Sequence, residues 1–358
     1  RHSMHQAIHG LFYALEHTFA DSLKNAPKRI GFMRAELHPR LPETLGIHTL
    51  YCSQSFKPEY DRLAQAGIAV TPTLTETLPT ANSHLDVIVY LPTRNREENK
   101  YMVAKGTEML KEGGVFITAQ HNTLGAKQYE KDIKKLLPDV TTASKNHCRL
   151  IQATKIQPDS KLYERYLAHG HPAPVEGTKM HALPGLFSGK KPDTGSQMLV
   201  DMIEQEDLSG RGADFGAGWG FLSQRALKMS PRIREMHLFE AEERALQCAK
   251  SNIGALIQNT HDKTKKVFYH WSDIPNETFD ARFDFILCNP PQHGVSNAET
   301  FLARQFIEQC GAALKTGGVL WLVTNQHIPA KKLLASHVGE AKLKDQDRQY
   351  AIFRAVKN

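Results

Sequence analysis

The chain has 358 residues, of which 41% are hydrophobic and 23% charged, as in an ordinary soluble globular protein, and this length predicts about two domains. Lys and Arg number 45 against 38 Asp and Glu, and the formal net charge of +7 permits a polyanionic partner without requiring one. Because no apolar run approaches the ~20 residues of a membrane span, we expect no membrane association and a cytoplasmic protein.

The amino-terminal half reads as strands alternating with helices, which predicts a doubly wound, mostly parallel α/β sheet. Helices are expected at residues 8–20 and 99–110, and strands at 29–33, 48–52, 68–71, 85–90, 115–118 and, as a late edge strand, 148–153. No strand of this half is followed by a glycine-rich turn, so it lacks the backbone donors that a nucleotide-type cofactor needs. Residues 1–160 are therefore expected to form a domain without a cofactor site.

The next segment is rich in proline and glycine, which predicts a linker and loops over residues 161–194. The second domain is expected over residues 195–358. It begins with a helix at 196–206, capped by Gly195 and Ser196, and continues with a strand that ends in a glycine turn. That turn carries Gly216, Gly218 and Gly220 and runs into a helix that ends near residue 229, an order that lets backbone N–H groups approach a ligand closely.

The following strands each end in a residue suited to a nucleoside. The strand at 236–239 ends in Glu240 and Ala241, and an acid there can hold the two hydroxyls of a ribose. The strand at 267–271 ends in Ser272 and Asp273, where we expect contact with an adenine amino group. Each acid alone would more often be an ordinary exposed side chain, but their succession after the glycine turn is specific.

A short apolar strand at 285–288 is stopped by Asn289, Pro290 and Pro291. The Asn289 side-chain oxygen can accept a hydrogen bond, and prolines have no N–H to occupy the neighbouring carbonyls. Such a corner suits an exocyclic amine, although Asn-Pro-Pro alone would equally be a strand-ending turn. A helix at 300–314, a strand at 319–323 and a final strand pair at 341–344 and 349–355 complete the domain.

The two halves resemble each other between residues 85–118 and 283–322, where Leu91-Pro92-Thr93 stands in place of Asn289-Pro290-Pro291. We favour duplication with loss of the amino-terminal site over chance similarity between two α/β sheets. The five cysteines are widely spaced and mostly in apolar runs, which predicts buried free thiols in a reducing compartment. The 18 histidines form no metal-binding pattern, so no metal is expected.

The chain resembles class I S-adenosylmethionine-dependent methyltransferases and, more narrowly, the small-subunit (16S) ribosomal RNA guanine-N2 methyltransferases of the RsmC type. The resemblance covers nearly the whole chain and is strongest from residue 183 onward. The residues that carry it are Leu183-Pro-Gly-Leu-Phe-Ser188, Asp193-Thr-Gly-Ser-Gln197, Asp214-Phe-Gly-Ala-Gly218, Asn289-Pro-Pro-Gln-His293 and Arg348-Gln-Tyr-Ala-Ile-Phe-Arg-Ala355. It implies two tandem Rossmann-like methyltransferase domains, the first degenerate.

The resemblance also implies roles for single residues. S-adenosylmethionine would contact Asp214, Gly216, Ala217 and Gly218 through its methionine part, Glu240 and Ala241 through its ribose, Ser272 and Asp273 through its adenine, and also Asn289. The catalytic segment would be Asn289, Pro290, Pro291, Gln292 and His293, in which Asn289 and the Pro290 carbonyl orient the target amine. The expected partner is ribosomal RNA or the small ribosomal subunit, with the protein acting as a monomer.

One position departs from the family, which usually has Phe or Tyr where this chain has Gln292. An aromatic ring there stacks on the target base, a contact worth about 1–3 kcal/mol, and Gln292 cannot stack. Trp219, Phe187 or Phe221 could replace it. Three alternatives stay open: methylation of another amine such as adenine N6 or a protein glutamine, a non-catalytic RNA- or ribosome-binding protein that kept the fold, and a small-molecule methyltransferase.

Overall fold

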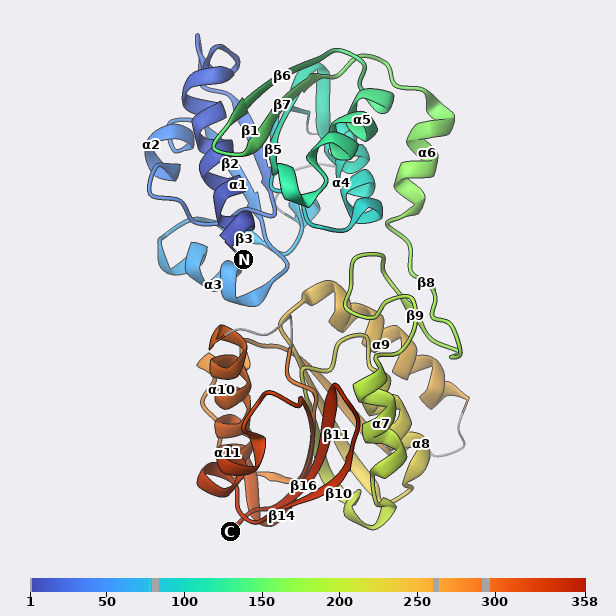
Figure 1. Ribbon diagram of the computed structural model, residues 1–358. Coiled ribbons are helices and arrows are strands. Elements are labelled where there is room, and N and C mark those ends of the chain that lie inside the picture. Colours follow the sequence, from blue (N-terminus) through green and yellow to red (C-terminus); the bar gives the residue numbers. More distant parts are fainter. Residues whose placement is uncertain (1, 77, 79–83, 260–263, 292–296) are drawn as a thin grey trace. The chain divides into compact units, whose positions relative to one another are not determined.

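The computed structural model describes residues 2–76, 78, 84–259, 264–291 and 297–358. The chain divides into two compact units, the first made of Arg1–Pro172 with Leu183–Gly185 and the second of Ala173–Ala182 with Leu186–Asn358. In each unit a seven-stranded sheet is covered by helices on both faces (Figure 1). Both units are therefore doubly wound α/β layers, as expected for tandem Rossmann-like domains.

In the first unit the strands follow the order β3-β2-β1-β4-β5-β7-β6. All neighbours are parallel except the pairs β5–β7 and β6–β7. The strands are β1 (Arg29–Met33), β2 (Thr49–Ser53), β3 (Val70–Thr71), β4 (Leu85–Tyr90), β5 (Leu110–His121), β6 (Val140–Lys145) and β7 (Cys148–Thr154). The helices are α1 (His2–Tyr13), α2 (Leu41–Leu45), α3 (Lys57–Gln65), α4 (Arg96–Met109), α5 (Ala126–Leu136) and α6 (Ser160–Ala168).

Alternation along β4 shows how the sheet separates two apolar layers. Val87 and Val89 pack with α1, α2 and α3, whereas Ile88 and Tyr90 pack with α4, α5 and α6. Successive side chains of a strand point to opposite faces, so a continuous apolar run is needed wherever both faces are covered. The run from Leu85 to Tyr90 meets this requirement, and the strand has the bounds that the sequence predicts.

The second unit has the equivalent strand order, β12-β11-β10-β13-β14-β16-β15. Its strands are β10 (Gly210–Phe215), β11 (Ile233–Glu240), β12 (Lys266–Trp271), β13 (Phe283–Cys288), β14 (Leu314–Asn325), β15 (Ala341–Gln346) and β16 (Tyr350–Val356). The helices are α7 (Thr194–Met202), α8 (Phe221–Met229), α9 (Glu243–Gln258), α10 (Asn297–Ala313) and α11 (Ala330–His337). Helices α10 and α11 cover one face and α7, α8 and α9 the other (Figure 1), while β8 (Ala173–Pro174) and β9 (His181–Ala182) form a separate ribbon.

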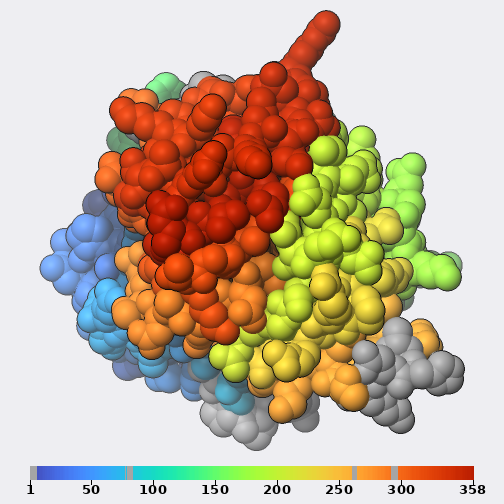
Figure 2. Space-filling view, turned by 90° about the horizontal axis from the view of Figure 1, so that it is seen from below, coloured from blue at the N-terminus to red at the C-terminus, as the bar shows by residue number. Residues whose placement is uncertain are grey.

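Helix α7 packs against β14, β15 and β16. Figure 2 shows the result on one face of the molecule, where the α7 segment (yellow-green) borders the carboxyl-terminal strands (red). This contact joins residues separated by about 150 positions in the chain, and it brings the start of α7 beside the start of β16. The amino-terminal end of α7 is thereby fixed near the carboxyl end of the parallel strands.

Three local predictions are wrong. The strand 148–153 is not an edge strand, because β6, whose side chains are largely exposed and polar, pairs outside it and was not recognised. The segment expected to be linker contains helix α6, which begins at the N-cap Asp159 and places Tyr166 in the core. Helix α7 begins earlier than predicted, and its N-cap is Asp193 rather than Gly195 or Ser196. All five cysteines are buried free thiols, as expected.

Candidate active site

The glycine turn after β10 is held by the backbone of β11. The N–H groups of Gly216 and Ala217 both donate to the carbonyl of Phe239, at 2.9 and 3.0 Å. Gly216, Gly218 and Gly220 have φ values of 85°, 56° and 96°, which side chains with a Cβ rarely adopt. A Cβ on Gly218 would meet no atom of the described residues within 4 Å, so the turn faces open space at this position. The sequence explains the turn, and the open space gives a ligand access to its backbone.

Asp214 lies at the carboxyl end of β10 and is fully buried. Its Oδ2 accepts a hydrogen bond from Ser223 Oγ at 2.6 Å, whereas its Oδ1 has no hydrogen-bond partner among the residues that the structure describes. Burial raises the pKa of Asp214 to about 7, opposed by the Ser223 bond and assisted by the nearby Glu240 charge. A buried oxygen without a donor costs free energy, so this atom is suited to a cationic or N–H group of a bound molecule.

Glu240, at the end of β11, ties the turn to the next strand. Its Oε2 accepts from Gly218 N at 2.7 Å and its Oε1 from Glu242 N at 2.9 Å. Burial raises the pKa of this carboxyl, and the two backbone N–H groups oppose the shift. A carboxylate has about four acceptor positions, so Glu240 can accept two hydroxyl groups in addition. The side chain is half-buried and lies beside the glycine turn.

The end of β12 follows the same pattern. Ser272 N donates to the Glu240 carbonyl at 2.9 Å, which holds the two strand ends together. Asp273 is nearly buried, and its Oδ2 accepts from Asn276 Nδ2 at 2.7 Å. The Ala241 carbonyl accepts from Trp271 Nε1 at 2.8 Å. Ala241, Ser272 and Asp273 therefore lie at adjacent strand ends, next to Glu240.

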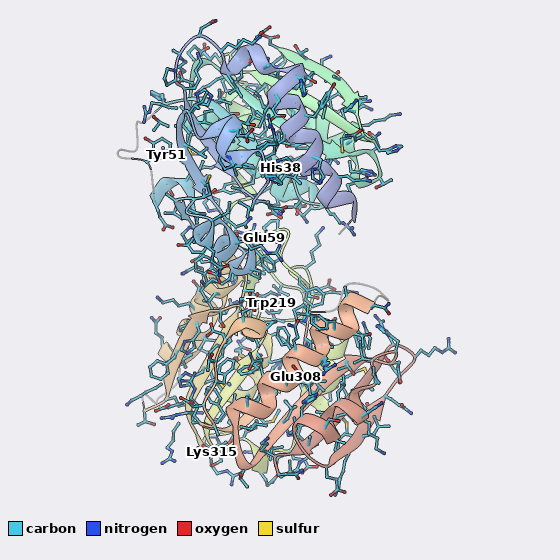
Figure 3. All side chains as sticks on the ribbon, turned by 90° about the vertical axis from the view of Figure 1, so that its left-hand side faces the viewer. His38, Tyr51, Glu59, Trp219, Glu308 and Lys315 are labelled. Atoms are coloured by element: carbon cyan, nitrogen blue, oxygen red, sulfur yellow. The ribbon has the colours of Figure 1, made fainter. Side chains whose placement is uncertain are left out.

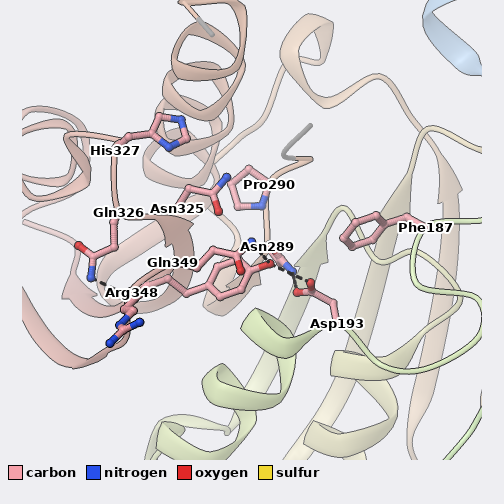
Figure 4. A pocket seen from close by; sticks show the side chains of 10 residues that line it. Phe187, Asp193, Asn289, Pro290, Asn325, Gln326, His327, Arg348 and Gln349 are labelled. Atoms are coloured by element: carbon pink, nitrogen blue, oxygen red, sulfur yellow. Dashed lines mark hydrogen bonds between the residues drawn. The ribbon is translucent and has the colours of Figure 1, made fainter. Parts of the chain in front are cut away.

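Asn289 lies one residue beyond β13, and its amide is oriented by two acceptors. Its Nδ2 donates to Asp193 Oδ2 at 3.0 Å (Figure 4) and to Ser196 Oγ at 2.8 Å. Because a carboxylate can only accept, the Asp193 contact fixes which end of the amide is nitrogen. With both N–H groups engaged, Asn289 can act toward a ligand only as an acceptor through Oδ1. A Cβ on Gly216 would lie 3.4 Å from the Asn289 carbonyl oxygen, so this corner adjoins the glycine turn.

A cavity of about 490 Å³ opens at Asn289 and the buried Pro290. Its wall combines aromatic, amide and charged side chains from four segments that are distant in the chain (Figure 4). The lining residues are Phe187, Asp193, Asn289, Pro290, Asn325, Gln326, His327, Arg348, Gln349 and Tyr350. The volume lies in the range of sites that hold small ligands.

Gln292 and His293, both predicted for the catalytic segment, lie outside the described residues. Pro291 is exposed. Of the three aromatic residues considered as replacements at Gln292, Trp219 and Phe221 are only 4% and 7% exposed, whereas Phe187 is 59% exposed and lines the cavity. The Phe187 carbonyl accepts from Trp219 Nε1 at 3.2 Å, which holds its backbone.

The sequence-based site omitted the residues that surround Asn289. Asp193 and Ser196 belong to a motif quoted for the family resemblance, and Arg348 and Tyr350 belong to another, but neither motif was given a role. Asn325 ends β14 and Gln326 and His327 follow it, and no local sequence signal marks the three. They reach the cavity because β14 and β16 are antiparallel neighbours, with Asn325 opposite Tyr350.

Within the described parts of the chain, no helix is both long and apolar enough to cross a membrane. Nor do three or more His, Cys, Asp or Glu side chains of these residues gather in a way that could hold a metal ion.

Comparison with known families shows that residues 177–354 match the methyltransferase small domain. Among curated proteins, the chain is 28% identical to ribosomal RNA small subunit methyltransferase C of Shewanella pealeana, over 78% of this chain and 80% of that protein. The protein of the same name from Haemophilus influenzae is 25% identical, over 76% of this chain and 79% of that protein.

Among solved structures, the chain is similar to a T. thermophilus 16S rRNA N2 methyltransferase (RsmC) in complex with AdoMet and guanosine. The TM-score is 0.75 and the identity 22%, over 94% of this chain and 90% of that one. This likeness extends over both units and confirms the tandem fold.

Proposed function

We propose that this protein, whose residues 177–354 match the methyltransferase small domain, methylates the exocyclic N2 amine of a guanine in small-subunit ribosomal RNA, with S-adenosylmethionine as methyl donor. The observation that carries this proposal is the Asn289 amide, which Asp193 and Ser196 orient as an acceptor beside both the glycine turn and a cavity. The names of the similar proteins support the substrate class.

The residues around the glycine turn fit the methyl donor. The Asp214 Oδ1, which has no donor among the described residues, suits the α-ammonium group of its methionine part, and the open space at Gly218 admits a ligand close to the turn that Gly216, Ala217 and Gly218 form. Glu240 and Ala241 would hold the ribose, and Ser272 and Asp273 the adenine. When bound, the donor supplies a methyl group made electrophilic by a positively charged sulfur.

The acceptor side needs orientation rather than a strong base. The lone pair of guanine N2 is delocalised into the ring, so the amine is a poor nucleophile until its protons are held out of the ring plane. Asn289 Oδ1 and the Pro290 carbonyl can accept hydrogen bonds from those two N–H groups and direct the nitrogen lone pair toward the glycine turn. The N–CH3 bond would form as the S–CH3 bond breaks, and the methylated nitrogen would release one proton to solvent. Holding reactants in such a geometry contributes a large part of the rate enhancement of many enzymes.

The cavity supplies the remaining contacts of the target. A base must leave its stack or pair to enter a pocket of this kind, so we expect a flipped or single-stranded guanine. Phe187 is placed to stack on the base in place of the aromatic residue missing at Gln292, and Arg348 offers a positive charge to a phosphate. We place Asn289, Pro290, Pro291, Gln292 and His293 in the catalytic segment, with the enzyme acting as a monomer in the cytoplasm, where ribosomes are found.

The same proposal includes a first domain that is degenerate, with the methyltransferase fold but without its cofactor site. The first unit, which extends to Pro172 and includes helix α6, would lack a cofactor site, and the second unit would form the catalytic domain. We expect the first domain to contribute RNA-binding surface or to shield the second.

The test is methyl transfer from radiolabelled S-adenosylmethionine to deproteinised ribosomal RNA and to isolated small subunits, followed by digestion to nucleosides. Label in N2-methylguanosine that is lost in Asn289→Ala is the expected result. Label in N6-methyladenosine or in protein would show that the substrate is another amine. Cofactor binding without any transfer would favour a non-catalytic RNA-binding protein.

A further inference from the structure

We propose that Asp193, steadied by Tyr350, is a positioning residue that keeps the Asn289 amide in its acceptor orientation, an inference that rests on the proposed function for its catalytic consequence. An asparagine amide can rotate by 180° and exchange its oxygen for its nitrogen with little change in shape. A rotated Asn289 would present N–H groups to an amine that also carries N–H groups. The site therefore needs a device that selects one of the two orientations.

Asp193 selects the orientation because its carboxylate only accepts hydrogen bonds. Its Oδ2 lies 3.0 Å from Asn289 Nδ2 and 2.9 Å from Ser196 N. If the amide were rotated, Asn289 Oδ1 would face this oxygen, and two acceptors would repel each other. Ser196 Oγ, at 2.8 Å from Asn289 Nδ2, is a hydroxyl that could either donate or accept, so it cannot select the orientation alone.

Tyr350 holds the carboxylate from the other side. Its hydroxyl donates to Asp193 Oδ1 at 3.3 Å and accepts from Gln349 Nε2 at 3.1 Å. The Tyr350 ring also packs against Gly195, where a Cβ would lie 3.0 Å from the ring. Burial, together with Asp193, raises the pKa of Tyr350 to about 12, so the hydroxyl remains a donor at neutral pH.

The turn that carries Tyr350 is itself braced. Asp347 Oδ1 accepts from Gln349 N and Tyr350 N at 2.8 and 2.6 Å, and Gln326 Nε2 donates to the Asp347 carbonyl at 2.8 Å. These bonds connect the β15–β16 turn to the end of β14. A chain of contacts thus runs from the sheet through Tyr350 and Asp193 to Asn289, and Figure 4 shows Asp193 and Asn289 beside each other at the cavity.

Asp193 is also the N-cap of α7, and the experiment separates this structural role from positioning. Both Ser and Asn are good N-caps. Asp193→Asn keeps a carbonyl oxygen that can accept from Ser196 N and from Asn289 Nδ2, whereas the shorter side chain of Asp193→Ser can cap the helix without reaching Asn289. Asp159→Ser is the matched control, because Asp159 caps α6 in the first unit through a bond to Leu162 N of 2.8 Å.

The first readout is the side-chain amide of Asn289 in ¹⁵N-labelled protein, identified by its loss in Asn289→Ala. The two Nδ2 protons should exchange slowly with solvent in the native protein, in Asp193→Asn and in Asp159→Ser, and rapidly in Asp193→Ser. Rapid exchange in the native protein, or slow exchange in Asp193→Ser, would overturn the positioning role whether or not the protein methylates RNA.

The second readout is turnover. In Asp193→Ser, kcat for guanine methylation should fall by about 10²-fold, as for a misplaced reacting group, while cofactor Kd and the KM for RNA stay unchanged. Tyr350→Phe should lower kcat by about threefold, the effect of one hydrogen bond, and Asp193→Asn by no more than that. Equal losses in Asp193→Asn and Asp193→Ser would overturn the positioning role. If the native protein methylates no RNA but its Asn289 amide exchanges slowly, the proposed function is rejected, and the role of Asp193 in orienting the amide is retained.

Discussion

The two units have equivalent contacts at the amino ends of their parallel strands and differ at the carboxyl ends. At the amino ends of the parallel strands, Asp86 accepts from Arg29 N and pairs with Lys111, and Asp284 accepts from Arg211 N and pairs with Lys315. Both N–H contacts measure 2.8 Å. In Figure 3, Lys315 and Trp219 mark the two opposite ends of the second unit, and the differences begin at the Trp219 end.

At the carboxyl ends of the strands, the second unit has groups that face the proposed ligand site. In the first unit, its own side chains occupy the equivalent positions. After β1, Ala35 N donates to the Ser53 carbonyl at 2.9 Å, as Gly216 N does to Phe239, but the turn contains Arg34 and no glycine. Gln54, at the position of Glu240, is buried and donates to the Ala35 carbonyl at 2.8 Å. The turn is therefore closed by internal bonds.

The corner after β4 is closed in the same way. Asn99 Oδ1 accepts from Tyr90 Oη and from Thr93 N, at 2.8 and 2.9 Å, and the Thr93 carbonyl accepts from Asn99 Nδ2 and Gln120 Nε2. The equivalent corner at Asn289 is instead oriented from α7. The comparison shows that the same arrangement of strands can carry either a corner filled by its own side chains or a corner that faces a ligand. The loops after the strands decide which of the two forms.

The sharpest test of this comparison is a reciprocal pair of asparagine variants. Asn289→Ala should lower kcat by about 10²–10³-fold, as removal of one preorganised polar group does in other active sites, with little change in the unfolding free energy. Methyl transfer and thermal unfolding measure the two effects. A comparable loss of stability would show that Asn289 serves packing as Asn99 does.

Asn99→Ala should behave in the opposite way. It leaves the Tyr90 hydroxyl and Thr93 N–H without their acceptor in a buried site, so unfolding should become easier by about 1–3 kcal/mol. Denaturant titration measures this change. Turnover of the folded variant should remain that of the native protein, and a selective loss of kcat would show that the first unit takes part in the reaction.

Two aspartates should give pH dependences of opposite sign. Because burial raises the pKa of Asp214 to about 7, its folded form holds a proton more tightly than the unfolded chain. This contribution to stability is present below the ordinary pKa of 3.8 and is lost as the pH rises through about 7. The stability of Asp214→Asn relative to the native protein should therefore increase, by on the order of 2 kcal/mol between pH 4 and pH 8.

Asp86 is the contrasting case. Burial tends to raise its pKa, but the Arg29 N–H and Lys111 bonds prevail and the pKa is lowered. Its contribution is complete above the ordinary value of 3.8 and disappears as the pH falls through the folded pKa, so Asp86→Asn should cost about 1 kcal/mol at pH 7 and less under acid conditions. Urea titrations over this pH range test both signs, and parallel profiles for the two variants would refute them.

The smallest expected effect is that of alanine at two glycines, which separates contact with a ligand from backbone strain. Gly218 and Gly125 both have positive φ and open space around a built Cβ. Alanine at either should cost about 1 kcal/mol of stability through its left-handed backbone. Only Gly218→Ala should also weaken S-adenosylmethionine binding, measured by calorimetry, because only this position faces the proposed cofactor. Equal affinities of the two variants would remove Gly218 from the cofactor site.

Strand positions were predictable where residues are apolar on both faces, so β1 and β4 have the predicted bounds. The polar edge strand β6 and the helix α6 were not, since neither shows a continuous apolar pattern. The site residues also fall into a predictable and an unpredictable group. Asp214, Glu240, Asp273 and Asn289 lie at or just after the ends of successive strands and could be proposed from the sequence, whereas Asp193 and Tyr350 meet Asn289 only through tertiary packing.

The buried cysteines make the protein a convenient scaffold for probes. Burial raises the pKa of Cys52 to about 12 and that of Cys148 to about 11, so these thiols are almost entirely protonated at neutral pH and react slowly with maleimides. Cys248, Cys288 and Cys310 are equally shielded from solvent. A single cysteine introduced on the surface of each unit could therefore carry a fluorophore pair without removal of any native thiol. Energy transfer between the dyes would then measure the distance between the two labelled positions.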